Sequence, residues 1–193
     1  MYIDRILFPI ETLGPGNRIV VWTRGCSKHC QNCANPELWS VSGCRHTSVS
    51  DAAQIIKNIC AEDSVDGITF TGGDPLEQFD ELIELLTLIK PLLDDILVYT
   101  GFTMDEMTAL YTADKIAAFK NLASVLIDGP YVDELNDSKS ALKGSTNQRL
   151  IYFDSTVEAK YEHYLLKGRK VQNMMMGNKF ISVGIHNKRG TKL

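Results

Sequence analysis

The sequence predicts an α/β fold: an open, partial (β/α) barrel with a mainly parallel sheet and a C-terminal β-hairpin. Short β-branched and apolar runs alternate along the chain with amphipathic helical patterns, which is typical of βαβ units. The chain has 193 residues, whereas a closed eight-fold barrel typically needs about 250. No repeat, low-complexity tract or linker interrupts the pattern, so we expect one domain over residues 1–193.

The first part of the chain predicts two strands with a helix between them. Residues 18–23 are apolar and β-branched, the pattern of a buried strand. Residues 50–61 predict an amphipathic helix with Ser50 as its N-cap. Cys60 lies on the apolar stripe of this helix, where we expect a buried core thiol. Residues 67–71 predict the second strand.

The rest of the chain continues the alternation of strands and helices. Thr103-x-x-Glu106 is a capping box, and Ser155-x-x-Glu158 predicts the start of another helix. The predicted elements are a helix over 76–93, a strand over 95–100, a helix after 103, a short helix around 115–119, strands over 123–127 and 149–153, a helix ending at 166, and a hairpin with arms 170–176 and 179–185 around Gly177-Asn178.

Composition excludes several classes of protein. Hydrophobic residues make up 44% and charged residues 23%, the net charge is −4, and no Lys/Arg-rich run occurs, so we expect no nucleic-acid partner. No apolar stretch reaches the roughly 18 residues of a membrane span, and the first six residues resemble no targeting peptide. Five cysteines, three of them crowded together, indicate reduced thiols and a cytoplasmic protein. Cys44 is either an incidental loop thiol or a functional one.

Three of these cysteines form the most informative motif of the chain. Cys26, Cys30 and Cys33 follow the strand over 18–23 with the spacing C-x₃-C-x₂-C. Three thiolates leave one position open at a centre that takes four ligands. Zinc would need His29 or His46 as a fourth ligand, whereas an iron–sulfur cluster would use the three thiolates and leave one iron exposed. The compact triplet favours the cluster, and the zinc site stays as the alternative.

Gly72-Gly73-Asp74-Pro75 is the second motif. It is either an ordinary turn in which Pro75 opens a helix, or a turn where glycines let a ligand approach the backbone and Asp74 faces an ammonium group. It lacks the residues of a P-loop or a dinucleotide fingerprint.

Four loops follow predicted strands directly. They are the cysteine loop, the Gly72–Pro75 turn, Thr100-Gly101 and Asp128-Gly129. Since ligands gather at the carboxyl ends of parallel strands, we expect all four loops on one rim of the sheet.

Two other segments have two interpretations each. Residues 144–149 are either an ordinary polar loop or a polar clamp at the mouth of the rim. The run Met174-Met175-Met176 indicates packing of the hairpin or, less simply, a binding surface.

Taken together, these motifs resemble the radical S-adenosylmethionine (SAM) superfamily, and among its members the activating enzymes of anaerobic ribonucleotide reductase. The resemblance covers residues 8–153 and leaves 154–193 as a C-terminal extension. Asn32 stands where the superfamily often has an aromatic residue. The shared segments are Gly14-Pro15-Gly16-x-Arg18, Gly25 to Cys33, Asn35-Pro36-x-Leu38-Trp39, Thr71 to Leu76, Tyr99 to Phe102, Asp128 to Tyr131 and Gly144 to Gln148.

The resemblance implies two cofactors, a [4Fe–4S] cluster and SAM. It implies that one electron cleaves SAM and yields a 5′-deoxyadenosyl radical, which abstracts a hydrogen atom from the substrate. The implied cluster ligands are Cys26, Cys30 and Cys33. The implied SAM contacts are Gly72, Gly73 and Asp74 at the amino end, Asn32 and Ala34 in the same pocket, and Thr100 and Gly101 near the ribose.

The resemblance also implies the partners. An activating enzyme takes the hydrogen atom from a glycine of a large glycyl-radical enzyme, here an anaerobic ribonucleotide reductase, and receives its electron from a low-potential donor such as flavodoxin or ferredoxin. The C-terminal extension leaves a second hypothesis, a radical SAM enzyme acting on another peptide or a small molecule. The third hypothesis is a non-catalytic zinc-binding interaction module.

Overall fold

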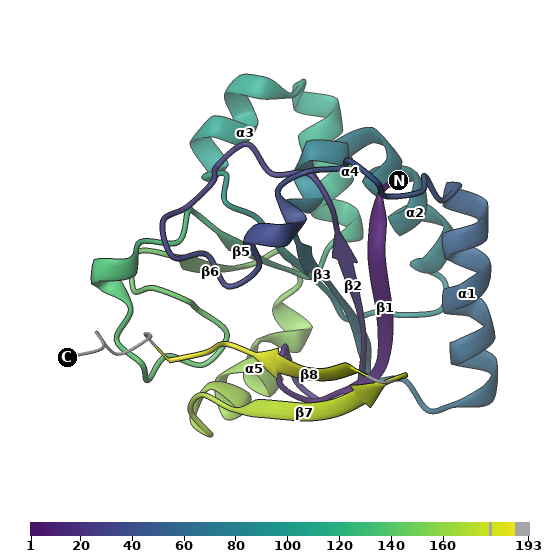
Figure 1. Ribbon diagram of the computed structural model, residues 1–193. Coiled ribbons are helices and arrows are strands. Elements are labelled where there is room, and N and C mark those ends of the chain that lie inside the picture. The colour runs from purple at the N-terminus through teal and green to yellow at the C-terminus, as the bar shows by residue number, and fades with distance from the viewer. Residues whose placement is uncertain (178, 188–193) are drawn as a thin grey trace.

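The computed structural model describes residues 1–177 and 179–187 and contains one six-stranded sheet and one separate hairpin (Figure 1). In the large sheet the strands lie in chain order, from β1 at one edge to β6 at the other. The strands are β1 (Ile3–Ile10), β2 (Arg18–Thr23), β3 (Gly67–Gly72), β4 (Ile96–Tyr99), β5 (Val125–Asp128), β6 (Arg149–Tyr152), and in the hairpin β7 (Val171–Met176) and β8 (Lys179–Gly184).

Strands β2 to β5 are parallel to one another, and the edge strands β1 and β6 pair antiparallel to their neighbours. The predicted α/β fold with a mainly parallel sheet and a C-terminal hairpin is therefore confirmed. Asn178, in the predicted hairpin turn, lies outside the described residues. Strand β1 is absent from the prediction, because Pro9 and two charged residues obscure its apolar alternation, a pattern tolerated at a sheet edge.

Five α-helices accompany the sheet. They are α1 (Val49–Glu62), α2 (Phe79–Ile89), α3 (Met104–Leu110), α4 (Ala113–Leu122) and α5 (Glu158–Leu165). Short 3₁₀ turns lie at Pro36–Leu38, Pro75–Gln78, Asp133–Leu135 and Ser155–Val157. Within the described residues no helix is long and apolar enough to cross a lipid bilayer.

The observed N-caps of the helices overturn two predictions and confirm one. Ser48, not Ser50, caps α1, because the Ser48 hydroxyl accepts a hydrogen bond from the Asp51 amide at 3.0 Å. Asp154, not Ser155, caps the turn that leads into α5. The capping box at Thr103 is present as predicted.

Both faces of the sheet are buried along the parallel strands, which are apolar at most positions. Ile19, Val21 and Phe70 point to one face and belong to the core under α1, α2 and α4. Val20 and Trp22 point to the opposite face and pack with the hairpin. Figure 1 shows these helices and the hairpin on opposite sides of the sheet. The loops at the strand ends are therefore held between two packed layers.

A buried ion pair joins the amino ends of three parallel strands to α5. The Arg18 side chain is fully buried, and its Nη1 lies 2.9 Å from Asp95 Oδ2 while its Nε donates to Thr69 Oγ1 at 2.8 Å. The Tyr161 hydroxyl donates to Asp95 Oδ1 at 2.8 Å, and Lys160 Nζ lies 2.6 Å from Oδ2. Burial alone would raise the pKa of Asp95, but the Arg18 and Lys160 cations outweigh it and lower this pKa.

We predict that Asp95→Asn destabilises the protein strongly. Without the carboxylate, the buried Arg18 cation loses its counter-charge, a change that typically costs about 3 kcal/mol or more. Urea denaturation measures the loss, with Asp94→Asn at the exposed neighbouring position as the control, for which we expect a change within about 0.5 kcal/mol. Equal stability of the two variants would contradict the role given to this ion pair.

Candidate functional site

The carboxyl ends of β2, β3, β4 and β5 open into one cavity of about 840 Å³. The four loops expected on one rim all contribute to its lining, which confirms that they converge. Every residue that the sequence predicted for the site lines this cavity: Cys26, Cys30, Asn32, Cys33, Ala34, Gly72, Gly73, Asp74, Thr100 and Gly101.

The cysteine loop follows β2 and is folded back on itself. Gly25, His29 and Asn32 all have positive φ angles, which turn the chain sharply between the cysteines. The loop is anchored by hydrogen bonds from the Gly25 amide to the Leu38 carbonyl (2.9 Å) and from the Cys33 amide to the Cys30 carbonyl (3.1 Å). All three thiols are free and half-buried.

Burial raises the pKa of the Cys26 thiol and of the Cys30 thiol. Backbone amides act in the opposite direction: those of Lys28 and His29 face the Cys26 sulfur, and that of Tyr131 faces the Cys30 sulfur. Such amides stabilise the thiolate form that binds metal, and a bound metal ion removes the thiol proton outright.

The described part of the chain contains no group of three His, Cys, Asp or Glu side chains arranged to hold one metal ion. The His29 ring lies against Trp39, with ring centroids 4.7 Å apart, and His46 Nε2 lies 2.8 Å from Glu81 Oε1. Neither histidine completes the zinc site that was the alternative. An iron–sulfur cluster does not need sulfurs that converge on one point, because each thiolate binds a different iron.

The Gly72-Gly73 turn packs directly against the cysteine loop. The Gly73 amide donates to the Thr23 carbonyl at 2.8 Å, and the Asp74 amide donates to the Gly25 carbonyl at 2.7 Å. A Cβ atom on Gly73 would lie 2.5 Å from the Gly25 oxygen. The close approach at Gly73 is therefore to the cysteine loop, and the approach of a ligand to these glycines stays a prediction.

Asp74 joins the loop after β3 to the loop after β4. Its side chain is 1% exposed; Oδ1 accepts from the Leu76 amide (3.0 Å) and the Thr100 hydroxyl (2.9 Å), and Oδ2 accepts from the Gly101 amide (2.8 Å). Burial raises the pKa of Asp74 to about 6, although these donors oppose the shift. Asp74 thus orients the loops and also places a titratable carboxyl beside the cavity.

Three buried side-chain polar atoms in the described residues have no hydrogen-bond partner: Arg5 Nε, Trp39 Nε1 and Tyr99 OH. All three residues line the cavity. Buried donors are rarely left unpaired in native proteins unless a ligand or water satisfies them. SAM carries a carboxylate, ribose hydroxyls and ring nitrogens that can accept such bonds, so the lining fits this cofactor. Trp39 and Tyr99 lie in the motifs that carry the family resemblance, whereas no sequence motif includes Arg5.

The far walls of the cavity come from segments with weaker sequence signals. Gln148 accepts from the Gly144 amide (2.8 Å) and donates to the Gly129 carbonyl (3.0 Å), and both Gln148 and Gly144 line the cavity. The polar segment 144–149 therefore fixes the loop after β5. The hairpin contributes residues 182–184 and the segment after it.

The remaining candidates lie away from the cavity. Met174 packs into the core between hairpin and sheet, whereas Met175 is 65% exposed. Cys44 lies in a loop with its sulfur 3.5 Å from the Ile3 carbonyl oxygen. Cys60 is half-buried against the core, less buried than expected, because it lies near the edge of the apolar stripe of α1.

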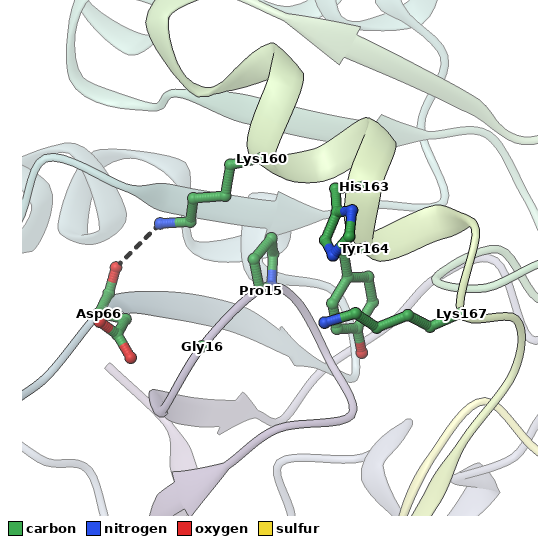
Figure 2. Close-up of a pocket in the computed structure, with 7 residues that line it drawn as sticks. All are labelled: Pro15, Gly16, Asp66, Lys160, His163, Tyr164 and Lys167. Atoms are coloured by element: carbon green, nitrogen blue, oxygen red, sulfur yellow. Dashed lines mark hydrogen bonds between the residues drawn. The ribbon is translucent and has the colours of Figure 1, made fainter.

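A second cavity, of about 310 Å³, lies at the opposite, amino-terminal edge of the parallel strands. Figure 2 shows Lys160 donating to the Asp66 carbonyl, at 3.3 Å, and His163 and Lys167 beside it on and after α5. None of the sequence-predicted site residues lines it. The chemistry of the chain is therefore concentrated at the carboxyl-terminal cavity.

Comparison with known proteins agrees with this geometry. Residues 12–151 match the family described as "4Fe-4S single cluster domain". The anaerobic ribonucleoside-triphosphate reductase-activating protein of Escherichia coli K12 is 30% identical over 147 residues, covering 73% of this chain and 92% of the relative. The protein of the same name from phage T4 is 29% identical, covering 78% and 93%. The pyruvate formate-lyase-activating enzyme of Listeria monocytogenes is 40% identical over 87 residues, 42% of this chain and 35% of the relative.

We predict that the stability difference between wild type and Asp74→Asn depends on pH. An acid whose pKa is raised on folding stabilises the folded state only below its unfolded pKa, and that contribution is lost as pH rises towards the folded pKa of about 6. Asn does not titrate. Between pH 4 and pH 7 the variant should therefore gain on the order of 2 kcal/mol relative to wild type.

Urea denaturation of the ligand-free protein at several pH values measures this change. Asp94→Asn serves as the control, because its side chain is exposed. A stability difference between wild type and Asp74→Asn that stays constant from pH 4 to pH 7 would show that Asp74 is not the titrating group.

Proposed function

Since this chain belongs to the 4Fe-4S single cluster domain family, among the radical SAM activating proteins, we propose that it generates a glycyl radical on an anaerobic ribonucleotide reductase. The observation that carries the proposal is the convergence of the cysteine triplet, the Gly72–Asp74 turn and Thr100-Gly101 on one cavity, which is also lined by the three residues with unpaired buried donors.

Cys26, Cys30 and Cys33 are the proposed ligands of the cluster. They come from one loop, so their relative placement depends on the turns at His29 and Asn32 and on the anchoring bond from Gly25 to Leu38. With three protein ligands, the fourth iron is left for a small molecule.

The proposed SAM contacts surround this position. The Gly72-Gly73 backbone and Asp74 would hold the amino end, Asn32 and Ala34 would line the same pocket, and Thr100 with Gly101 would lie near the ribose. A bound cationic amine favours the ionised form of Asp74, so the binding of SAM should lower the pKa of Asp74. We therefore expect SAM to bind more tightly as pH rises through about 6.

When bound and reduced, the cofactors supply a 5′-deoxyadenosyl radical that abstracts a hydrogen atom. The residues of the chain position the cofactors and exclude water. Trp39, Tyr99 and the hairpin residue Val183 add apolar surface to the cavity, and a reactive intermediate survives longer in a site that water cannot enter.

The wider setting is proposed on the same basis. The six-stranded sheet would be a partial barrel whose open side admits a loop of the partner. Residues 1–193 would form one domain, with a core over 8–153 and an extension over 154–193. The protein would act in the cytoplasm and receive electrons from flavodoxin or ferredoxin.

A second candidate is a radical SAM enzyme that acts on another peptide or a small molecule. It is favoured by the C-terminal hairpin, which lines the cavity although it lies outside the matched residues 12–151.

We predict that Cys26→Ser, Cys30→Ser and Cys33→Ser each lose the cluster, because each removes the thiolate of one iron. Iron and sulfide content and visible absorbance after anaerobic reconstitution measure the loss. Cys44→Ser and Cys60→Ser are matched controls and should load as wild type does. Loss of the cluster from a control, or full loading of a triplet variant, would contradict this ligand assignment.

We also predict that the reconstituted protein, SAM and a reductant produce an electron-spin-resonance doublet on an anaerobic ribonucleotide reductase. Gly73→Ala should weaken this signal, because the added Cβ forces the turn away from the cysteine loop. If wild type with a loaded cluster cleaves SAM but gives no doublet, the reductase is not the substrate and the second candidate stands.

A further inference from the structure

Arg169 lies in the C-terminal extension and is nearly buried, with 5% of its side chain exposed. Its guanidinium donates to four acceptors: Asn136 Oδ1 (2.9 Å), Ser140 O (3.2 Å), Lys143 O (3.0 Å) and His186 O (2.8 Å). Three of these acceptors belong to the loop between β5 and β6, and the fourth follows β8. One side chain therefore joins the extension to a loop of the matched region.

From this loop, hydrogen bonds continue to the cysteine loop. Asn136 Nδ2 donates to the Tyr131 hydroxyl (3.1 Å), which donates to Asp133 Oδ1 (2.7 Å), and Asn32 Nδ2 donates to Asp133 Oδ2 (3.1 Å). The Tyr131 amide also faces the Cys30 sulfur. A continuous path thus runs from Arg169 to the segment between two of the cysteines.

The loop between β5 and β6 depends on such contacts for its conformation. Its regular structure is limited to the 3₁₀ turn at Asp133–Leu135, and Ser138 and Leu142 both have positive φ angles. The carbonyl groups at positions 140 and 143 accept hydrogen bonds from Arg169, whereas in a sheet they would accept them from a neighbouring strand. A planar guanidinium with five donors can hold several acceptors at once, which a lysine ammonium cannot match geometrically.

We propose that Arg169 is a positioning residue for the cysteine loop, acting through Asn136, Tyr131 and Asp133 on Asn32 and Cys30. The proposal rests on the proposed function in that the cysteine loop is taken to hold the cluster. Because Arg169 lies outside the matched residues 12–151, this chain controls the placement of its cysteine loop from a segment that the family match does not include.

Hydrogen–deuterium exchange on the reconstituted full-length protein tests the proposal. In Arg169→Gln we expect the backbone amides of residues 27–33 to exchange about tenfold faster. The reason is that the variant lacks the charge-assisted hydrogen bonds that hold the loop between β5 and β6. Lys170→Gln, at the exposed neighbouring position, is the matched control and should exchange as wild type does.

Tyr131→Phe breaks the path in its middle and leaves the contacts of Arg169 in place. It should speed exchange in 27–33 while 140–143 stays as protected as in wild type. As a second readout, the electron-spin-resonance spectrum of the reduced cluster with SAM should change in both variants and stay unchanged in Lys170→Gln.

If exchange in Arg169→Gln rises only in 136–143 and near 186, Arg169 is a local structural residue and the proposal is overturned. The same holds if Tyr131→Phe leaves 27–33 unaffected. These outcomes differ from a failure of the proposed function, which would appear as wild type that takes up no cluster.

Discussion

The parallel alignment of β2 to β5 is the constraint on which the rest of the molecule depends, and the buried Arg18–Asp95 pair fixes its first three strands, β2 to β4. Arg18 starts β2, Thr69 lies in β3 and Asp95 precedes β4, so sliding any of these strands breaks a buried charge-assisted bond. A slip of one residue would also turn every side chain to the opposite face. Since both faces are packed, the carboxyl ends have one arrangement, and the four loops meet at one cavity.

At that edge, each loop is held by its neighbour instead of by its own strand alone. Gly73 lies against the Gly25 carbonyl of the cysteine loop, and the Asp74 carboxylate reaches the loop after β4 through Thr100 and Gly101. The arrangement places a buried ionisable carboxyl and three half-buried thiols at one edge of the sheet. Groups of this kind favour a cationic, thiolate-binding ligand, since such a ligand stabilises their ionised forms.

Local features could be predicted from the sequence, and so could the convergence of the four loops, because the carboxyl ends of parallel strands share one edge. Individual side-chain contacts between distant segments could not be predicted. The cysteine spacing, the strand-then-glycine pattern and the capping box at Thr103 each depend on residues within a few positions of one another. Pro9 hides the periodicity of strand β1. Both Ser48 and Ser50 fit the capping rule for α1, and the cap predicted from the sequence lies two residues too late. The bond from Asn32 to Asp133 joins positions 101 residues apart, and no local pattern indicates it.

The C-terminal extension changes what the resemblance to smaller activating proteins can imply. Val183 packs with Trp22 against the face of the sheet opposite α1 and α2, and it lines the cavity, as do Ser182 and Arg169. The residues proposed to bind the cofactors lie in the matched region, so identity to relatives there bears on the chemistry. The extension lies outside the matched residues 12–151 and also lines the cavity, so the surface that a hydrogen donor would meet there includes residues that the family match does not cover.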